Sequence, residues 1–298
     1  MKSRRLLAAA LACSFISVPA LAQELAGTLK KIRDGNTISL GHRESSIPFS
    51  YYDDRQQVVG YSHELMLRVV SAVKAELKLP NLQVKLMPVT SQNRITLVQN
   101  GTVDIECGST TNNLERQKQV AFSDSIFIIG TRLLVRKDSG IRDFADLAGR
   151  NVVTTAGTTS ERLLRKMNED KKMGMAIISA KDHGESFLTL ETGRAVAFMM
   201  DDALLAGEMA KARRPGDWAI VGSAQSREAY GCMLRRDDPA FKKLVDAALA
   251  KAMLAGDAEK IYRKWFMAPI PPKGLNLNLA PSEDILQLYR HPNDKALD

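Results

Sequence analysis

The sequence predicts an α/β protein made of two units, one of which is interrupted by the other. Strand-like and helix-like patterns alternate along the chain, a second such series occupies its middle, and the first series resumes near residues 227–231. Alternation of this kind predicts a largely parallel sheet in each unit, with ligands at the carboxyl ends of the strands. The two connections between the units are expected to form a hinge.

The first unit contains a helix whose apolar residues Leu65, Val69, Val73 and Leu77 are four residues apart. This spacing is typical of a helix that faces a core. A later helix has a stop signal in Asn-Gly at 100–101. The elements expected in this part are a strand at 37–41, the helix within 58–77, a strand at 82–89, the helix that opens at 91–94, and a strand at 103–107.

The second unit is reached through an apolar strand, SIFIIGTRLLV, at 125–135. Its expected elements are a short helix at 143–150, strands at 151–155, 195–201 and 218–222, and a helix at 161–170. The first unit then resumes with helices at 240–254 and 258–266, and the last residues, 274–298, are expected to form a surface tail.

Residues 1–22 have the features of a secretory signal peptide. Lys2, Arg4 and Arg5 precede an interrupted apolar stretch that ends in Ala-Leu-Ala, so cleavage is expected after Ala22. No later segment is apolar over the roughly 20 residues that a membrane span needs. The chain is therefore expected to be exported and soluble. Lipidation at Cys13 fits less well, because the expected Leu is displaced by one position.

The charge of the chain argues against nucleic acid as a partner. The formal net charge is +8, and removal of the three basic residues of the signal peptide leaves 39 − 34 = +5. Lys and Arg are scattered, and aromatic residues make up only 6% of the chain. We therefore expect no binding of nucleic acid, whereas an anionic ligand remains compatible with the basic excess.

Two cysteines remain after the signal peptide, Cys107 and Cys232. An even number in an exported chain favours a disulfide between them; the alternative is two buried thiols that never meet. The four histidines are not part of an HExxH motif, and neither CxxC nor GxSxG occurs. The sequence therefore gives no signal for a metal, a cofactor or a catalytic site.

Two stretches are candidates for anion binding. Residues 108–117 surround Arg116 with uncharged hydrogen-bonding side chains, among them Thr111, and a guanidinium can hold a carboxylate through two parallel bonds. In AGTTSERLL, Thr158 and Glu161 have the spacing of a capping box, so a helix begins there with amides free to receive an anion. The alternatives are a solvated surface arginine and an ordinary capped helix.

Further charged residues lie at the ends of expected elements. Asp201 ends an apolar strand and could accept from an ammonium group, whereas Asp202 is expected to cap the next helix. Arg43 follows the first strand, Arg94 lies at a helix start, and His183 lies in the second unit. Together these three would suit a second carboxylate, although each also has an ordinary interpretation as a solvated charge or a loop residue.

Longer stretches resemble the extracytoplasmic solute-binding proteins of polar amino-acid ABC importers, in particular their members for acidic amino acids. The resemblance covers nearly the whole chain after the signal peptide, and it is carried by GHRESSIPFSYYD (41–53), TSQNRITLVQNGTVDIECGSTTNNLERQKQVAFSD (90–124), TTAGTTSERLL (154–164), ISAKDHGESF (178–187), AVAFMMDDALLAGE (195–208) and EAYGCMLRRDDP (228–239).

The resemblance implies a type II periplasmic-binding-protein fold: two lobes, each a mostly parallel sheet flanked by helices, joined by two crossover strands. The lobes would comprise 23–127 with 228–298, and 128–227. The implied ligand is L-glutamate or L-aspartate. The implied binding residues are Arg116, Thr111 and Thr159 for the α-carboxylate, Asp201 and Ser109 for the α-ammonium, and Arg43, Ser91, Arg94 and His183 for the side-chain carboxylate.

These observations predict a periplasmic, monomeric binding protein that closes around an acidic amino acid and passes it to the permease of an ABC importer. Two alternatives remain open. An enzyme such as a dehydratase can occur on the same fold, with Glu44 or Glu106 as its only plausible general acid, and a ligand sensor for a receptor would use the same pocket.

Overall fold

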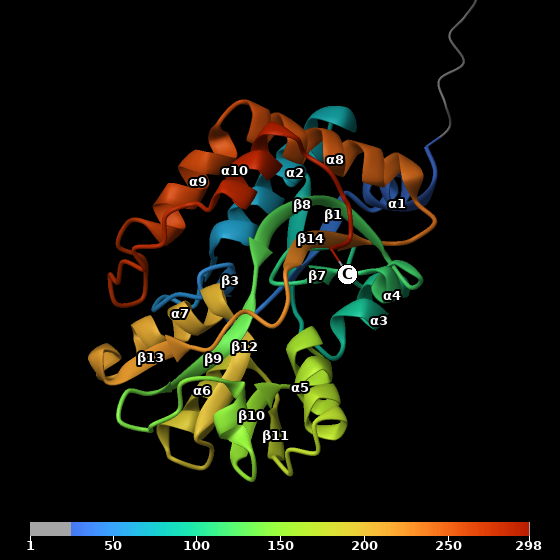
Figure 1. Cartoon of the computed structure of the whole chain (residues 1–298). Helices are drawn as coiled ribbons and strands as arrows, with labels where there is room; N and C mark the ends of the chain where they lie inside the picture. The colour runs from blue at the N-terminus through green and yellow to red at the C-terminus, as the bar shows by residue number, and fades with distance from the viewer. Residues whose placement is uncertain (1–24, 298) are drawn as a thin grey trace, which may run out of the picture.

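The structure is a computed structural model that describes residues 25–297, so the expected signal peptide at 1–22 and Cys13 lie outside the described part. Figure 1 shows two lobes, the larger of which contains both ends of the described chain. The expected two-lobed α/β fold is thus confirmed. Among the described helices, none combines the length and the apolar character that a membrane span requires.

The sheet of the first lobe has six strands in the order β5-β1-β6-β14-β7, with β8 also paired to β14. β1 runs parallel to β5 and β6, whereas β14 is antiparallel to β6, β7 and β8. The strands are β1 (Thr37–His42), β5 (Gln83–Pro88), β6 (Ile105–Glu106), β7 (Thr111–Asn112), β8 (Ala121–Ile129) and β14 (Glu228–Leu234). The sheet is therefore mixed, not mostly parallel as expected.

The sheet of the second lobe has the order β11-β10-β12-β9-β13. β10 is parallel to both its neighbours, and β9 is antiparallel to both of its own. The strands are β9 (Thr131–Arg136), β10 (Asn151–Thr155), β11 (Ala176–Ala180), β12 (Ala197–Asp201) and β13 (Trp218–Val221). This sheet is also mixed, because the strand that enters the lobe runs against the strands built from βα units.

Two connections join the lobes. The apolar run at 125–135 is divided at Gly130 into β8 and β9, and residues 222–227 lead from β13 back to β14. Glu228 pairs with Ile129 across the two crossings. One strand leaves the first lobe where the other returns, which explains why they are antiparallel.

Helices flank both sheets (Figure 1). The helix expected within 58–77 spans Tyr61–Glu76, and its residues Leu65, Val69 and Val73 are fully buried. The helices of the first lobe are α1 (Gly27–Gly35), α2 (Tyr61–Glu76), α3 (Arg94–Gln99), α4 (Leu114–Gln117), α8 (Pro239–Leu254), α9 (Asp257–Phe266) and α10 (Glu283–Arg290); those of the second are α5 (Thr159–Asp170), α6 (His183–Glu191) and α7 (Asp202–Lys211).

Two helix starts differ from expectation. The Thr158 hydroxyl accepts from the Glu161 amide, but the Glu161 carboxylate turns to the amide of Gly157, so only half of the expected capping box forms. Asp201, not Asp202, is the N-cap residue of α7, and it makes no side-chain cap bond. Its carboxylate is thereby left for other partners. The expected short helix at 143–150 is a 3-10 turn, Phe144–Leu147.

The expectation of a surface tail at 274–298 is wrong for much of this segment. α10 packs against the first lobe with Ile285, Leu288 and Tyr289 buried. The Tyr289 hydroxyl lies 2.6 Å from that of Tyr61 in α2. Apolar residues three and four apart in this helix allow it to cover the lobe. The polar residues on either side of the helix made this spacing hard to recognise in the sequence.

A short three-stranded sheet, β2 (Ser45–Ser46), β3 (Ser50–Tyr52) and β4 (Val58–Val59), follows β1. Phe49, beside it, makes edge contacts with Tyr61, Phe127 and Phe266. Edge-to-face packing of buried aromatic rings stabilises such a cluster beyond the area that it buries. The cluster therefore fixes the loop after β1, which carries Arg43, to the core of the first lobe.

Candidate functional site

The two lobes bring the sequence-predicted residues together where strands end and helices begin. The first lobe contributes Arg43, Ser91, Arg94, Ser109, Thr111 and Arg116, and the second contributes Thr159, His183 and Asp201. Apart from Thr159, which is half-buried, each is at most 7% exposed. Charged residues are rarely buried to this extent without a partner, so this region differs from an ordinary surface.

The lobes touch around these residues. Arg162 of α5 forms an ion pair with Glu115 of α4, and the amide of Gly184 donates to the Ser45 hydroxyl at 3.4 Å. A Cβ added at Gly207 of α7 would lie 2.2 Å from the carbonyl oxygen of Ile47. The predicted residues are therefore enclosed between the lobes.

Arg43 and Arg94 form a buried cationic pair. Nη1 of Arg94 donates to the carbonyl oxygen of Ser109 at 3.0 Å, and Nη1 of Arg43 lies 3.4 Å from the Ser109 hydroxyl oxygen. Burial, reinforced by the nearby Arg94, lowers the pKa of Arg43 to about 10. Burial also lowers the pKa of Arg94. Both remain cations near neutral pH, and this part of the site favours an anion.

Glu106 is the buried counter-charge of this pair. It is fully buried at the end of β6, and its Oε2 accepts from the Thr110 hydroxyl at 2.7 Å. A Cβ at Gly108 would lie 2.5 Å from Oε1 of Glu106 and 2.9 Å from Cγ of Arg43, so a larger residue there would displace these side chains. The negative charge of Glu106 raises the pKa of both Arg43 and Arg94 against the effect of burial.

Several buried polar atoms beside the pair have no hydrogen-bond partner among residues 25–297. They are the Ser91 hydroxyl oxygen, Nε of Arg94, Oε1 of Glu106 and Nε2 of His183. Buried polar groups normally have partners because an unpaired group costs ~1–3 kcal/mol. Three of the four belong to residues predicted to hold one carboxylate. Their chemistry fits an anionic group placed among them.

His183 begins α6, and its Nδ1 lies 2.9 Å from the Thr155 hydroxyl oxygen. Burial and the positive charges of Arg43 and Arg94 hold the pKa of His183 well below its usual value. The ring is therefore neutral near pH 7. A neutral imidazole can still donate one hydrogen bond to a carboxylate.

Arg116 contacts both lobes. Asn113 caps α4 by accepting from the Arg116 amide at 2.8 Å, which orients the helix turn that carries the guanidinium. Nη1 donates to the Thr111 carbonyl oxygen at 2.9 Å, and Nη2 lies 3.4 Å from that of Gly157. Burial, and secondarily Arg94, lowers the pKa of Arg116 to about 9. It remains a cation that can bind a carboxylate.

Asp201 is enclosed by hydroxyl groups. Its Oδ1 accepts from Ser160 at 2.9 Å, and its Oδ2 accepts from Tyr230. Burial, together with the charge of Glu228, raises the pKa of Asp201 to about 7. A cation such as an ammonium group would stabilise its ionised form.

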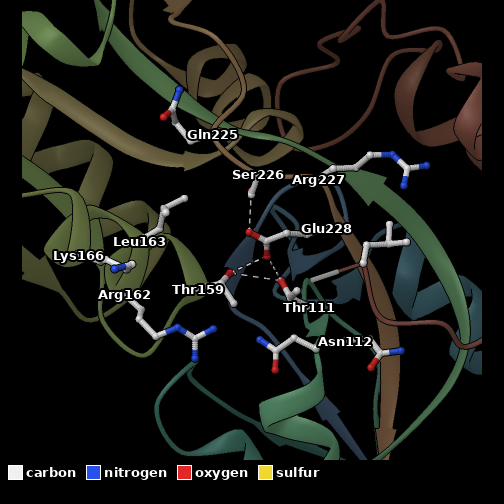
Figure 2. A pocket seen from close by; sticks show the side chains of 12 residues that line it. Thr111, Asn112, Thr159, Arg162, Leu163, Lys166, Gln225, Ser226, Arg227 and Glu228 are labelled. Atoms are coloured by element: carbon white, nitrogen blue, oxygen red, sulfur yellow. Dashed lines mark hydrogen bonds between the residues drawn. The ribbon is translucent and has the colours of Figure 1, made fainter. Parts of the chain in front are cut away.

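Glu228 and Tyr230, which were not predicted from the sequence, also belong to this region. Glu228 accepts from Thr111 at 2.6 Å, from Thr159 at 2.7 Å and from Ser226 at 2.7 Å (Figure 2). An available signal was the one used for Asp201, because Glu228 is the lone charged residue of the strand segment EAYGCML. Glu106 and Glu228 add two carboxylates to the site. Its positive and negative charges therefore balance more closely than in the predicted set, which had three arginines and one aspartate.

A pocket of about 300 Å³ opens beside Glu228, between α5 and the second crossing (Figure 2). Thr111, Thr159 and Glu228 form one of its walls, and Arg162 and Lys166 of α5 lie on the other side.

The expected disulfide joins Cys107 and Cys232. It links the residue that follows β6, two residues before Ser109, to β14. In the described part of the chain, His, Cys, Asp and Glu form no group of three or more that could hold a metal. Of the possible general acids, Glu44 is exposed, whereas Glu106 lies among the buried groups of the site.

Comparisons with known proteins agree with this architecture. Residues 38–268 match the family described as bacterial extracellular solute-binding proteins, family 3. An L-glutamate/L-aspartate-binding protein of Pseudomonas aeruginosa is 63% identical over 294 residues, which are 98% of this chain and 97% of the relative. A glutamate/aspartate import solute-binding protein of Escherichia coli is 60% identical over 293 residues, 98% and 97% of the two chains.

Among solved structures, a mutant of ArgBP from T. maritima is similar, with a TM-score of 0.72, 25% identity, and coverage of 80% of this chain and 99% of that one. An ancestral arginine-binding protein bound to arginine has a TM-score of 0.69 at 28% identity, covering 78% and 98%. The sequence relatives are named as binding proteins, not as enzymes. The chain belongs to the bacterial extracellular solute-binding proteins of family 3.

Proposed function

We propose that this protein captures L-glutamate and L-aspartate outside the cytoplasm and delivers them to an ABC importer. Relatives of 60–63% identity over nearly the whole chain carry names with these two ligands. The buried charges between the lobes support the same ligands, because an acidic amino acid has two carboxylates and one ammonium group.

The observation that carries the proposal is the set of unpaired buried atoms beside Arg43 and Arg94. Among the residues described, no group bonds to the Ser91 hydroxyl, Nε of Arg94 or Nε2 of His183. We assign them, with Arg43, to the side-chain carboxylate of the ligand. A neutral amide would leave donors or charge unsatisfied, at a cost of roughly 1–3 kcal/mol per group, so glutamine is rejected.

At the other end of the ligand, Arg116 holds the α-carboxylate and Asp201 accepts from the α-ammonium. Ser109 lies beside Arg43 and belongs to the ammonium side by the resemblance, as Thr111 and Thr159 belong to the carboxylate side. The contacts of Arg116 with main-chain carbonyls of both lobes support its place at the junction.

We place the hinge at Gly130 and at residues 222–227, next to the lobe boundaries expected from sequence. One lobe then comprises 23–127 with 228–298, and the other 128–227. Because the assigned residues come from both lobes, a ligand binds the closed arrangement more tightly than an open one and shifts the population toward it. In this proposal the protein acts as a monomer in the periplasm and meets the permease subunits there.

Neither alternative gains support. The relatives are binding proteins, Glu44 is exposed, and Glu106 is held by Thr110 as the counter-charge of the arginine pair. A sensor role would use the same residues, and no feature of the described surface favours it.

Isothermal titration with both acids and both amides tests the proposal. L-glutamate and L-aspartate should bind in the micromolar range or tighter, and glutamine and asparagine should compete at least about 10-fold less well, as expected from one unsatisfied group. Absence of heat with both acids would contradict the proposed function, and equal competition by glutamine would contradict the role of the arginine pair.

A further inference from the structure

Glu228 is the residue at which both lobes and the second crossing meet. Its Oε2 accepts from Thr111 of the first lobe at 2.6 Å and from Thr159 of the second at 2.7 Å. Its Oε1 accepts from Ser226 at 2.7 Å and lies 3.4 Å from the hydroxyl oxygen of Thr131. Figure 2 shows the carboxylate pointing between the two threonines. Side chains that are distant in sequence are thus held by one anion.

These bonds determine what the two threonine hydroxyls can offer a ligand. A hydroxyl has one hydrogen to donate and two lone pairs with which to accept. Because Thr111 and Thr159 give their hydrogens to Glu228, their oxygens, 3.4 Å apart, face any other group as acceptors. An acceptor is matched by an N–H group and repelled by a carboxylate.

Glu228 also makes this end of the site anionic. The Thr131 hydroxyl lies 3.5 Å from Oδ1 of Asp201 and 3.4 Å from Oε1 of Glu228, so the two acids lie close together. The negative charge of Glu228 raises the pKa of Arg116 against the effect of burial. The charges of Glu228 and Asp201 both act on Arg116, and an ammonium group near the two carboxylates would restore the balance of charge.

We propose that Glu228 is a specificity-determining residue, which orients the hydroxyls of Thr111 and Thr159 as acceptors and so makes binding depend on the ligand's α-ammonium group. The inference rests on the proposed function and changes one assignment within it. The Thr111 hydroxyl serves the ammonium, not the α-carboxylate. Thr159 serves the ammonium through its hydroxyl and the carboxylate through its amide, which lies in the first turn of α5, where helix amides lack internal partners.

The test compares L-glutamate with glutarate, which has the same two carboxylates but no amino group. Both ligands are titrated calorimetrically into the full mature protein, the variant Glu228→Gln and the control Glu64→Gln. Glutamine at 228 keeps the size and one acceptor but removes the charge. The control substitution also removes a negative charge. Glu64, however, lies on α2, where its carboxylate accepts from Lys264 and Trp265 of α9.

In Glu228→Gln, glutamate affinity should fall at least about 10-fold, the loss expected for a charge-assisted interaction, while glutarate affinity stays the same or rises. Glu64→Gln should match the wild type with both ligands. An equal loss for glutamate and glutarate would overturn the proposal, because it would reveal a merely structural role. Unchanged glutamate affinity would overturn it as well.

A second variant decides the matter if Glu228→Gln does not fold. In Thr111→Val the hydroxyl acceptor is lost, so glutamate affinity should fall while glutarate affinity is unchanged. If the Thr111 hydroxyl donates to a carboxylate instead, both affinities fall together and the proposal is wrong. Failure of the wild type to bind either acidic amino acid would refute the proposed function itself, which is a separate result.

Discussion

The hydroxyl of Tyr230 in β14 donates to the carboxylate of Asp201 at the end of β12, so a buried hydrogen bond joins the sheets of the two lobes. Both residues are nearly inaccessible to solvent. The hydrogen bonds to Asp201 come from the hydroxyls of Ser160 and Tyr230, so in the proposed function its ionisation is coupled to the arrival of the ligand's ammonium group. Two predictions depend on this coupling.

The first concerns affinity and pH. With its pKa raised to about 7, Asp201 is protonated in much of the ligand-free protein at pH 6. An ammonium group favours the ionised form, so glutamate affinity should decrease as the pH falls below about 7, by up to ~10-fold per pH unit. Titrations at several values between pH 5 and pH 8 measure this. In Asp201→Asn, glutamate affinity should be lower and should no longer decrease below about pH 7. If the same decrease persists in this variant, another group is responsible for it.

The second concerns stability without ligand. Since the folded-state pKa of Asp201 is raised, the folded protein binds this proton more tightly than the unfolded chain. The contribution of this bound proton to stability is fully present at low pH and is lost as the pH rises from about 4 to about 7. The stability of Asp201→Asn relative to the wild type should therefore increase over this range, as denaturant unfolding at a series of pH values would measure. A pH-independent difference would mean that Asp201 ionises normally.

His183 should bind as a neutral ring. Because burial and the two arginines hold its pKa well below the usual value, no loss of glutamate affinity is expected between about pH 7.5 and pH 9 from this residue. Replacing it by alanine should lower affinity about 10-fold, the effect of one hydrogen bond to a charged group. Calorimetry at both ends of this range checks the profile. A decline in the wild type that disappears in His183→Ala would indicate an imidazolium.

Arg94→Ala should affect binding more than folding. Removing one partner of a buried charged contact costs roughly 2–5 kcal/mol, so glutamate should bind about 100-fold more weakly or worse. Arg263→Ala, an exposed arginine on α9, is the matched control and should bind normally. Binding is measured by calorimetry and folding by thermal unfolding. A variant that binds like the control would exclude Arg94 from the site.

Reduction of the disulfide should destabilise the protein. Cys107 and Cys232 are 125 residues apart, and the loop they close contains the whole second lobe. Chain-entropy arguments give about 5 kcal/mol as an upper bound for a loop of this length. Denaturant unfolding with and without reductant should show a lower midpoint for the reduced wild type. The double variant Cys107→Ala, Cys232→Ala should not respond to reductant, and an equal response would assign the effect elsewhere.

Much of the architecture could be read from local patterns. The strand at 151–155, the helix at 239–254 and the return near Glu228 appear where periodicity predicts them. Local sequence patterns gave a wrong prediction where packing against an element distant in sequence determines the structure. The residues of α10 were expected in a tail because their polar flanks dominate the local composition, yet Tyr289 is buried against Tyr61, more than two hundred residues away.

The sequence by itself determined which residue types stand at strand ends and helix starts, because periodicity, capping and long motifs are written in neighbouring positions. These features indicated Arg43, Arg94, Arg116 and Asp201 as candidates, and the resemblance to the solute-binding proteins implied that they belong to one site. Only the tertiary structure decided the partners: that Glu228 takes the hydroxyl hydrogens of Thr111 and Thr159, and that Tyr230 reaches Asp201. Hydrogen bonds and pKa shifts depend on distances between atoms and on burial, which are fixed when separate segments pack together.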